Sequence, residues 1–283
     1  MAKKIVHRIY ELRSILREIR AAQKTIGFVP TMGYLHEGHL SLIRQAGKDC
    51  DFVVISIFVN PLQFGAGEDY AEYPRALSRD AKLAFANGCD LIFAPTVKEM
   101  YPQGFATFVE VERLSEHLCG ASRPGHFRGV TTVVTKLFNL VEPDHAYFGQ
   151  KDAQQAFIIK RMVADLNFDI TIHILPTVRE TDGLAMSSRN TYLNQKERQA
   201  APVLYRSLCA AKEKITQGER DAASLIAYIT KLIKQEPLAD IDYVNIVDLE
   251  NLQPCKKISG KALIAVAVRF GSTRLIDNII VEV

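Results

Sequence analysis

The sequence predicts an α/β protein with a doubly wound parallel sheet and a smaller C-terminal α+β domain. Up to Pro176, short uninterrupted apolar runs alternate with amphipathic helical patterns, as expected for strands that helices cover on both faces. After Pro176 the order changes to helical stretches followed by three adjacent strand-like runs. The chain has 283 residues and is 48% hydrophobic and 24% charged, which is ordinary for a globular protein and argues against disorder. We therefore expect a first domain over 1–177 and a second over 178–283.

The strands of the first domain are predicted from runs of β-branched and aromatic residues. These runs are too short for helices, and they are apolar throughout instead of at every second residue, which favours strands that are buried on both faces. Each of the first three runs ends at or beside a proline or an Asn-Pro pair. The predicted strands are 26–30, 52–59, 91–94, 146–148 and 170–175.

The helices of the first domain are predicted from apolar residues that recur at every third or fourth position. Asp152 is well placed to cap the last of them, because its carboxylate can accept from free backbone N–H groups. A long polar segment, 60–74, interrupts the pattern, and a loop of this length is usually functional. The predicted helices are 5–24, 40–46, 75–87, 130–141 and 152–166.

The second domain is predicted to contain a polar loop, two helical stretches and three strands. Helices followed by adjacent strands are typical of a small α+β unit. The predicted elements are the loop 177–190, helices near 195–216 and 221–234, and strands 241–249, 262–269 and 274–283.

Composition excludes several classes of protein. There are 35 Lys and Arg against 32 Asp and Glu, a formal charge of +3, and no long basic run, so we expect no nucleic-acid partner. The five cysteines are scattered without a CxxC pair, which is typical of reduced thiols in a cytoplasmic protein. No apolar stretch approaches the roughly 18–20 residues that span a bilayer, so we expect no membrane segment.

The first candidate site is the segment 30–39, PTMGYLHEGH, between a predicted strand and a predicted helix. At that edge of a parallel sheet, free backbone N–H groups and the helix dipole favour anionic ligands. Gly33 and Gly38 let the backbone approach a ligand closely. His36 and His39 are three residues apart, so they fall on one face of the first helical turn, where imidazoles can donate hydrogen bonds to phosphate oxygens. The segment therefore predicts a phosphate-binding site.

Other interpretations of this segment have less support. His-x-x-His can ligate zinc, but no third ligand lies nearby and the spacing is not that of HExxH proteases, so we assign no metal site. The segment lacks GxGxxG and GxxxxGK[ST], so the sequence supports neither a Rossmann dinucleotide site nor a P-loop. The plain structural alternative is a pair of surface histidines at a helix start.

The second candidate site is 185–190, AMSSRN, in the predicted polar loop. The hydroxyls of Ser187 and Ser188 and the guanidinium of Arg189 can form a phosphate clamp, because a guanidinium matches phosphate oxygens with two parallel N–H groups. Taken alone, such a segment is usually a solvated loop, so its function depends on the other motifs.

The third candidate site is 148–155, FGQKDAQQ, where a predicted strand passes into a helix. Lys151 can supply a charge to phosphate, and Asp152 can cap the helix or hold a ribose or a lysine. Gln155 lies one turn further and can bind a hydroxyl or carboxylate group. A Lys-Asp pair at a helix start is often only a cap, but its place at the sheet edge favours a functional role.

The fourth candidate site is 58–65, FVNPLQFG. Asn60 and Gln63 offer uncharged hydrogen-bonding groups beside two aromatic residues, which suits a small polar substrate with an apolar body. Asn-Pro alone is an ordinary turn signal.

Together these motifs resemble those of a known superfamily. The run His36–His39 matches HxGH, the signature of nucleotidyl transferases and class I aminoacyl-tRNA synthetases, and 185–190 resembles the KMSKS loop of the same superfamily, with Ser188 and Arg189 in its closing Lys-Ser region. More closely, the chain resembles the family of AMP-forming pantoate–β-alanine ligases. The C-terminal third carries little motif. The matching runs are FVPTMGYLHEGHLSL, ISIFVNPLQF, YPR, RPGHFRGVTTVV, YFGQKDAQQ and VRETDGLAMSSRNTYL.

The resemblance implies a role for each matching residue. The first domain would be Rossmann-like and bind ATP and pantoate, and the second would act as a lid. His39 would be the proton donor, and the other residues implied in catalysis are His36, Lys151, Asn60, Ser187, Ser188 and Arg189. Gln63, Gln155 and Asn60 would bind pantoate, and Gln63 would also serve β-alanine. The residues implied in ATP binding are Met32, Gly33, Tyr34, Leu35, His36, Glu37, Gly38, His39, Gly149, Gln150, Lys151, Asp152, Val178, Met186, Ser187, Ser188 and Arg189.

The resemblance also implies the reaction and its partners. Pantoate would attack the α-phosphorus of Mg-ATP and release pyrophosphate, and β-alanine would then displace AMP from the acyl adenylate. Positioning and charge stabilisation dominate such a phosphoryl transfer. A homodimer is expected, with ATP and Mg²⁺ as cofactors, and Asp80 is a residue that could bear on the metal.

Three other functions are compatible with part of the pattern, and two of them are disfavoured. A nucleotidyl transferase that stops after transferring AMP or CMP to a phosphate would need no amine substrate. A tRNA synthetase is disfavoured, because the chain has no room for an anticodon domain and no basic face. A nucleotide-binding sensor without catalysis is disfavoured by the intact His36, His39 and Lys151.

Overall fold

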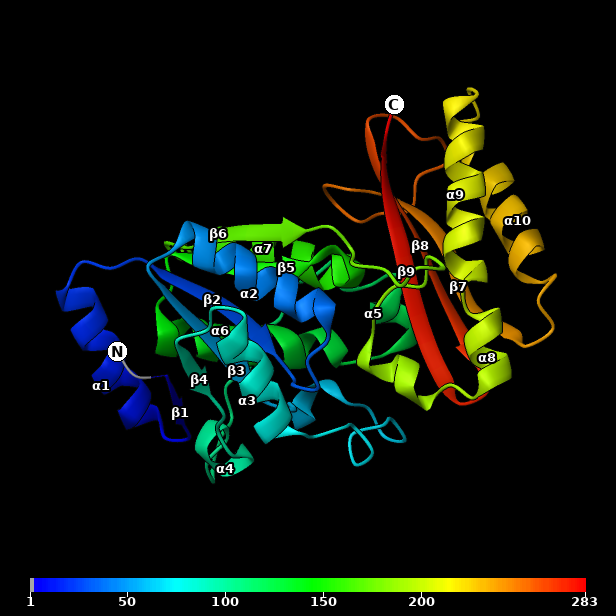
Figure 1. Cartoon of the computed structure of the whole chain (residues 1–283). Helices are drawn as coiled ribbons and strands as arrows, with labels where there is room; N and C mark the ends of the chain where they lie inside the picture. Colours follow the sequence, from blue (N-terminus) through cyan, green and yellow to red (C-terminus); the bar gives the residue numbers. More distant parts are fainter. Residues whose placement is uncertain (1–2) are drawn as a thin grey trace. The chain divides into compact units, whose positions relative to one another are not determined.

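A computed structural model describes residues 3–283 and confirms the predicted fold class (Figure 1). Contacts between residues divide the chain into two compact units. The first comprises the chain up to Val111, Arg123–Gly149 and Ile158–Pro176, and the second comprises Glu112–Ser122, Gln150–Phe157 and Thr177–Val283. A single domain boundary at residue 177 stays a prediction.

The first unit is built on a six-stranded parallel sheet. Its strands are β1 (Lys4–Val6), β2 (Ile26–Thr31), β3 (Phe52–Ile57), β4 (Leu91–Phe93), β5 (His145–Gly149) and β6 (Thr171–Leu175). They are ordered β1-β4-β3-β2-β5-β6, and every pair of neighbours is parallel. The chain runs outward from β2 through β3 and β4 on one side and through β5 and β6 on the other, so β2 and β5 form a switch point, where such sheets usually bind ligands.

Helices cover both faces of this sheet, which explains why its strands are apolar throughout. The helices with residues in this unit are α1 (Ile9–Ala21), α2 (Glu37–Asp49), α3 (Leu77–Ala86), α4 (Val97–Met100), α6 (His126–Val141) and the C-terminal part of α7 (Ala153–Asp165). On one face, Val29 lies in a buried cluster with Ile43 of α2 and Ala84 of α3. On the other face, Phe28 meets Phe138 of α6 edge to face, with 6.4 Å between ring centroids, and α1 packs against α6.

The helix predicted over 5–24 is wrong at its start. Residues Lys4–Val6 form β1, which pairs in parallel with β4 and buries Val6. Helix α1 begins at Ile9, where the carboxylate of Glu11 accepts from the backbone N–H of Arg8. A strand of three residues shows no period of its own, so its apolar residues fitted the helical pattern that follows it.

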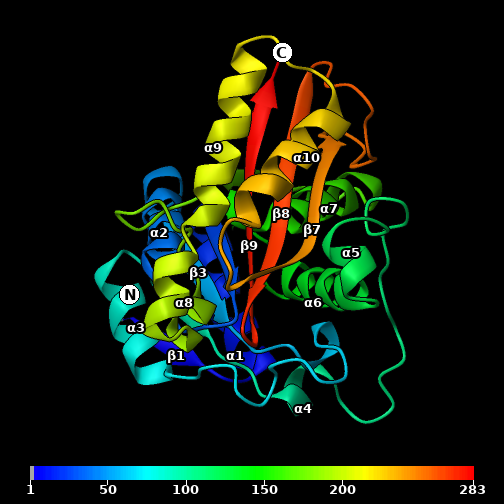
Figure 2. The ribbon, with the colours of Figure 1, turned by 90° about the vertical axis from the view of Figure 1, so that its right-hand side faces the viewer.

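The second unit contains an antiparallel sheet that two helices cover (Figure 2). Its strands are β7 (Ala239–Asp248), β8 (Lys261–Phe270) and β9 (Thr273–Glu282), and the covering helices are α9 (Val203–Thr216) and α10 (Ala222–Ile233). Leu208, Ile229 and Ile264 lie together in the core between them. A segment that includes α5 (Cys119–Ser122) also packs on this sheet, and the Cys119 Sγ lies 3.3 Å from the Tyr243 hydroxyl. All five cysteines are free, as predicted.

The helix predicted over 195–216 is two helices, and the prediction is wrong at Pro202. Helix α8 (Gln195–Ala200) ends before this proline, and α9 begins directly after it. Proline lacks a backbone N–H and its ring clashes with the preceding turn, so it starts helices and does not continue them. The three predicted strands of the unit are confirmed. Over residues 3–283, the structure contains no helix that combines the length and apolar character needed to cross a membrane.

Candidate active site

The loop after β2 lies at the switch point of the sheet and is held in one shape by Asp80 of α3. The Asp80 carboxylate is fully buried, and its two oxygens accept from the backbone N–H groups of Tyr34 at 2.7 Å and Leu35 at 2.8 Å. The Thr31 hydroxyl accepts from the N–H of Gly33 at 3.1 Å, and Gly33 adopts a φ of +87°, which suits glycine. The loop is therefore preorganised by side chains from β2 and α3.

This geometry gives Asp80 a positioning role, and a contact of Asp80 with the metal stays a prediction. Besides the two backbone groups, Asp80 accepts from a guanidinium N–H of Arg79 at 3.1 Å. Within the described range, 3–283, no group of three or more His, Cys, Asp or Glu side chains is placed to hold a metal ion. We therefore assign Asp80 to positioning the loop.

Replacing Asp80 by asparagine is expected to destabilise the protein and lower its activity. An amide has a single acceptor oxygen, so its NH₂ group would face the N–H of Tyr34 or Leu35, at a cost of about 1–3 kcal/mol. Urea unfolding should show a lower midpoint with an unchanged slope. Asp165→Asn is the matched control, because the Asp165 carboxylate forms an exposed ion pair with Arg161 on the surface of α7. Equal midpoints for the two variants would contradict the assignment.

His36 and His39 lie at the N-terminus of α2, as their spacing predicts, with ring centroids 4.1 Å apart. The Nδ1 atom of His36 accepts from the N–H of Gly38 at 3.2 Å, and the Nδ1 atom of His39 accepts from the N–H of His36 at 3.3 Å. Since each Nδ1 is an acceptor, a neutral ring carries its proton on Nε2. Gly38 permits this packing, because a Cβ there would lie 2.9 Å from Cε1 of His36. Both imidazoles are thus held as Nε2–H donors.

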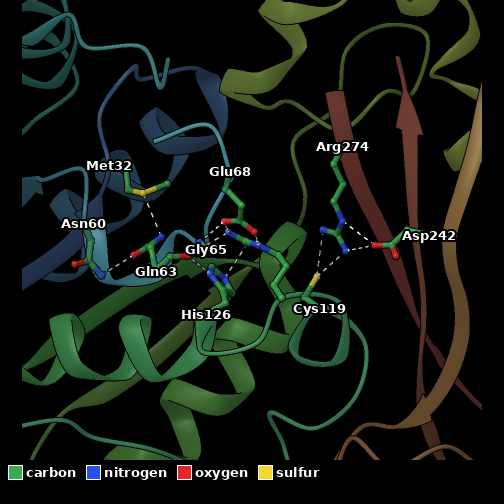
Figure 3. Close-up of polar contacts among 10 residues, drawn as sticks. Met32, Asn60, Gln63, Gly65, Glu68, Cys119, His126, Asp242 and Arg274 are labelled. Carbon is green, nitrogen blue, oxygen red and sulfur yellow. Dashed lines mark hydrogen bonds and ion pairs between the residues drawn. The ribbon is translucent and has the colours of Figure 1, made fainter. Parts of the chain in front are cut away.

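A second group of polar side chains surrounds Gln63, which is buried (Figure 3). Asn60 donates from Nδ2 to the side-chain oxygen of Gln63 at 3.1 Å, and Gln63 donates to Sδ of Met32 at 3.2 Å. Asn60 also donates to the carbonyl of Gly129 at 3.1 Å and accepts from the Tyr101 hydroxyl at 2.8 Å. The contacts of Asn60 fit the placing of Gln63, and Gln63 itself lies beside the loop that follows β2.

The backbone of Gln63 is held from the segment that begins α6 (Figure 3). Its carbonyl accepts from Arg123 at 3.2 Å and from Nδ1 of His126 at 2.8 Å. Arg123 also donates two hydrogen bonds of 2.6 Å to the carboxylate of Glu68, which accepts from the N–H of Gly65. The ion pair therefore ties the loop after Gln63 to the start of α6.

This ion pair is expected to make stability depend on pH. Burial disfavours the charged form of Glu68, but the hydrogen bonds and charge of Arg123 outweigh burial and lower the pKa of Glu68 to about 2. A lowered pKa adds stability that is complete above the ordinary value near 4.5 and is lost as the pH falls through about 2. Because both side chains are partly exposed, we expect a contribution on the order of 2 kcal/mol at pH 7.

The measurement is thermal unfolding of Glu68→Gln and wild type between pH 7 and pH 2. The difference in midpoint should be largest at neutral pH and shrink below pH 4.5. Glu18→Gln is the control, because Glu18 is exposed on α1. A difference that stays constant over this range would show that Glu68 is not stabilised as an anion.

The remaining predicted site residues follow β5 or lie in the second unit. Lys151 and Asp152 belong to a short 3-10 turn, η2 (Gln150–Asp152), directly before α7, and the Lys151 Nζ lies 3.9 Å from a carboxylate oxygen of Asp152. Gln154 is buried and its amide bonds to the backbone of the segment around Cys119. For Gln155, no side-chain hydrogen bond is seen with any described residue. That the amide of Gln155 binds a ligand, as the motif predicts, stays a prediction.

The polar loop predicted over 177–190 contains a hairpin and a short turn. Met186 donates its N–H to the carbonyl of Val178 at 3.0 Å, beside a bridge between Arg179 and Ala185. A 3-10 turn, η3 (Ser188–Tyr192), follows, and the Ser187 hydroxyl accepts from the N–H of Arg189 at 3.3 Å. Ordered backbone thus presents the Ser-Ser-Arg run.

Each unit gathers part of the predicted site. In the first unit, Met32 links the loop 32–39 to Gln63 and Asn60, and Gly149 ends β5 at the switch point. The second unit holds Gln150–Asp152, Gln155, Val178 and Met186–Arg189. That both sets bind one ligand stays a prediction.

Several residues around these groups were missed. The sequence patterns predict no role for Glu68 or Tyr101, and Arg123 and His126 enter only as part of the matching run that begins RPGHFRGV. The hydrogen bonds of Tyr101, Arg123 and His126 reach Asn60 and Gln63 across dozens of residues in the chain. The arginine and histidine of that run, beside its glycines, were the available signal.

The fold and the loop after β2 define the class of this protein. A doubly wound parallel sheet with an HxGH run at its switch point is an α/β nucleotide-binding protein of the HxGH superfamily.

Comparison with known proteins narrows the class to a family. The sequence profile of the family Pantoate-beta-alanine ligase matches residues 4–280. The chain is 62% identical to a pantothenate synthetase of Heliobacterium modesticaldum over 99% of this chain and 100% of that protein, and 61% identical to one of Pelotomaculum thermopropionicum over 98% of each. The chain therefore belongs to the pantoate–β-alanine ligase family.

Solved structures agree with this family. The crystal structure of pantothenate synthetase from Thermus thermophilus matches 98% of each chain with a TM-score of 0.93 and 50% identity. A pantoate–β-alanine ligase from Francisella tularensis, complexed with β,γ ATP and β-alanine, matches 98% of this chain and 97% of that one with a TM-score of 0.80 and 34% identity.

Proposed function

We propose that this chain condenses pantoate with β-alanine at the expense of ATP and so forms pantothenate. The observation that carries the proposal is the match of the whole chain to pantoate–β-alanine ligases together with an ordered HxGH run. The relative from Francisella tularensis, with an ATP compound and β-alanine bound, supports the substrates.

We propose a reaction in two steps. An oxygen of the pantoate carboxylate attacks the α-phosphorus of ATP. A new oxygen–phosphorus bond forms, the bond from the α-phosphorus to the oxygen that bridges to the β-phosphorus breaks, and pyrophosphate leaves. The amine of β-alanine then attacks the activated carbonyl carbon, the bond to AMP breaks, and the amine proton is lost. In the first step the protein forms no covalent bond to the reactants; it positions them and stabilises the charge that develops.

The described side chains suit these tasks. His36 and His39 carry Nε2–H donors for phosphate oxygens, and His39 is the proposed proton donor. Lys151, Ser187, Ser188 and Arg189 would bind the triphosphate, together with backbone of 32–38, 149–152, 178 and 186. Gln63, placed by Asn60, and Gln155 would bind pantoate, and Gln63 would also receive β-alanine.

We propose that Mg²⁺ accompanies ATP. Mg²⁺ in such sites is held largely by substrate phosphates and water. When bound, the ion neutralises charge on the triphosphate.

The test is to follow pyrophosphate and AMP separately with purified protein. Pantoate-dependent exchange of labelled pyrophosphate into ATP should appear without β-alanine, and AMP release should then require β-alanine. AMP transfer without any dependence on β-alanine would favour a nucleotidyl transferase. ATP binding without turnover of pantoate would overturn the proposal in favour of a sensor.

We further propose that the enzyme acts in the cytoplasm as a homodimer, as the family resemblance implies. Light scattering after size-exclusion chromatography tests the dimer, and a monomeric mass would contradict it.

A further inference from the structure

Two adjacent buried polar residues stand out on β9, in the part of the chain that carries little motif. Asp277 and Asn278 are 2% and 4% exposed. Successive side chains of a strand point to opposite faces of its sheet, and the two residues pair with Val266 and Ala265 of β8. Burying two polar side chains is costly unless their hydrogen bonds are satisfied. The hydrogen-bond partners of Asp277 and Asn278 therefore indicate why these two polar residues are buried.

Asn278 forms hydrogen bonds with the segment that contains Lys151. Its Nδ2 donates to the carbonyl of Gln150 and to the carbonyl of Lys151, both at 2.9 Å. Its side-chain oxygen accepts from the amide of Gln150 at 3.4 Å. All of the hydrogen-bonding groups of the Asn278 amide are thus directed at η2, and they fix the backbone from which the Lys151 side chain extends.

Asp277 forms an ion pair with the hairpin that precedes the Ser-Ser-Arg run. Its carboxylate accepts two hydrogen bonds from Arg179, at 2.7 and 2.9 Å, and the guanidinium of Arg179 stacks 3.6 Å from the ring centroid of Tyr205. Arg179 bridges to Ala185, immediately before Met186. Strand β9 also contacts both η2 and η3. One dipeptide of β9 therefore anchors both proposed phosphate-binding segments of the second unit.

We propose that Asn278 is a positioning residue for adenylation, which holds Lys151 where it meets the triphosphate, while Asp277 holds the hairpin of the Ser-Ser-Arg run. The inference rests on the proposed function of Lys151. A lysine side chain is long and flexible, so the placement of its ammonium group depends on a fixed backbone, and a misplacement of about 1 Å can cost about 10²-fold in rate. The C-terminal strand thereby contributes to the reaction without touching substrate.

The test uses Asn278→Asp, which keeps the shape of the side chain but turns its donors into acceptors that face two carbonyls. Pantoate-dependent ATP–pyrophosphate exchange should fall by roughly 10- to 100-fold in kcat/KM, while thermal unfolding reports the folded fraction. Asn278→Ser keeps one hydrogen-bond donor, so its kcat/KM for exchange should lie between those of wild type and Asn278→Asp. This variant replaces Asn278→Asp in the test if the aspartate variant does not fold. Asp277 is left intact, because its removal would leave the charge of the largely buried Arg179 without its carboxylate partner and destabilise the unit.

Asn245→Asp is the matched control. Asn245 lies in the same cross-strand row, since both Asn245 and Asn278 pair with Ala265, and its side chain makes no hydrogen bond that is seen among the described residues. The same chemical change in the same sheet should alter exchange by no more than about twofold.

A double-mutant cycle with Lys151→Ala separates positioning from a general structural effect. If Asn278 acts through Lys151, Asn278→Asp should cost little in the Lys151→Ala background. An equal cost in both backgrounds, or wild-type exchange in folded Asn278→Asp, would overturn the inference. Wild-type exchange in Lys151→Ala would instead refute the proposed function of Lys151.

Discussion

Replacing His39 by alanine is expected to slow pantoate-dependent ATP–pyrophosphate exchange by about 10²–10³-fold while the protein stays folded. The Nδ1 of His39 accepts from the backbone of His36, so its Nε2–H is fixed as a donor at the start of α2. Donors that are held in place before charge develops stabilise a transition state without reorganisation. The loss should fall on kcat more than on the KM for ATP, because the contact strengthens as charge builds.

His7→Ala is the control for this prediction. His7 lies between β1 and α1 and its Nδ1 contacts the carbonyl of Ala94, outside the proposed site. The His7→Ala variant should exchange pyrophosphate into ATP at close to the wild-type rate. Near-native exchange in folded His39→Ala would remove the HxGH run from the mechanism, and with it the main geometric support for the proposed function.

The fold could be predicted where the pattern of apolar residues within one segment is enough to identify the element. The runs at β2 and β3 are apolar because helices cover both faces of these strands, and this requirement is visible in the sequence itself. Strand β1 could not be found in this way, because its three residues are defined by their pairing with β4, more than eighty residues away in the chain. The break at Pro202 is different, because a proline inside a helical pattern is a local signal that ends one helix and begins the next.

The site could be predicted where its chemistry lies in one short run. His36, Gly38 and His39 interact with one another, so their spacing alone contains the geometry. Asp80 is different: a carboxylate in a helix gives no sign that it will accept two backbone N–H groups from a loop some 45 residues earlier. Positioning residues of this kind become visible only when the tertiary structure shows their partners.

The same argument explains why the C-terminal third looked uninformative. Asp277 and Asn278 sit in a run of otherwise apolar residues that reads as a plain strand. Their contacts reach Arg179 and η2, about 100 and 130 residues away. A motif search finds groups that touch a ligand, whereas these residues touch the backbone and side chains that present such groups.

The second large effect is expected from Gly129→Ala in α6. A Cβ at this position would lie 2.2 Å from the carbonyl oxygen of Leu62 and 2.6 Å from the backbone nitrogen of Gln63. Backbone atoms cannot rotate out of the way, so the turn η1 (Pro61–Gln63) must move. Such overpacking typically costs about 1–3 kcal/mol of stability. The displaced Gln63 should also lower kcat/KM for pantoate by up to about 10²-fold.

Gly47→Ala provides a matched control for Gly129→Ala, because Gly47 also lies in a helix, α2, but its Cβ would meet only Cγ2 of Val53 at an ordinary 3.8 Å. Alanine is the better helix former, so Gly47→Ala should gain up to about 1 kcal/mol in urea unfolding and keep wild-type kinetics. If Gly129→Ala behaves in the same way, the close approach of α6 to η1 does not place Gln63. If Gly129→Ala loses stability but keeps wild-type kcat/KM for pantoate, the contact supports the fold alone and Gln63 does not bind pantoate in the position proposed.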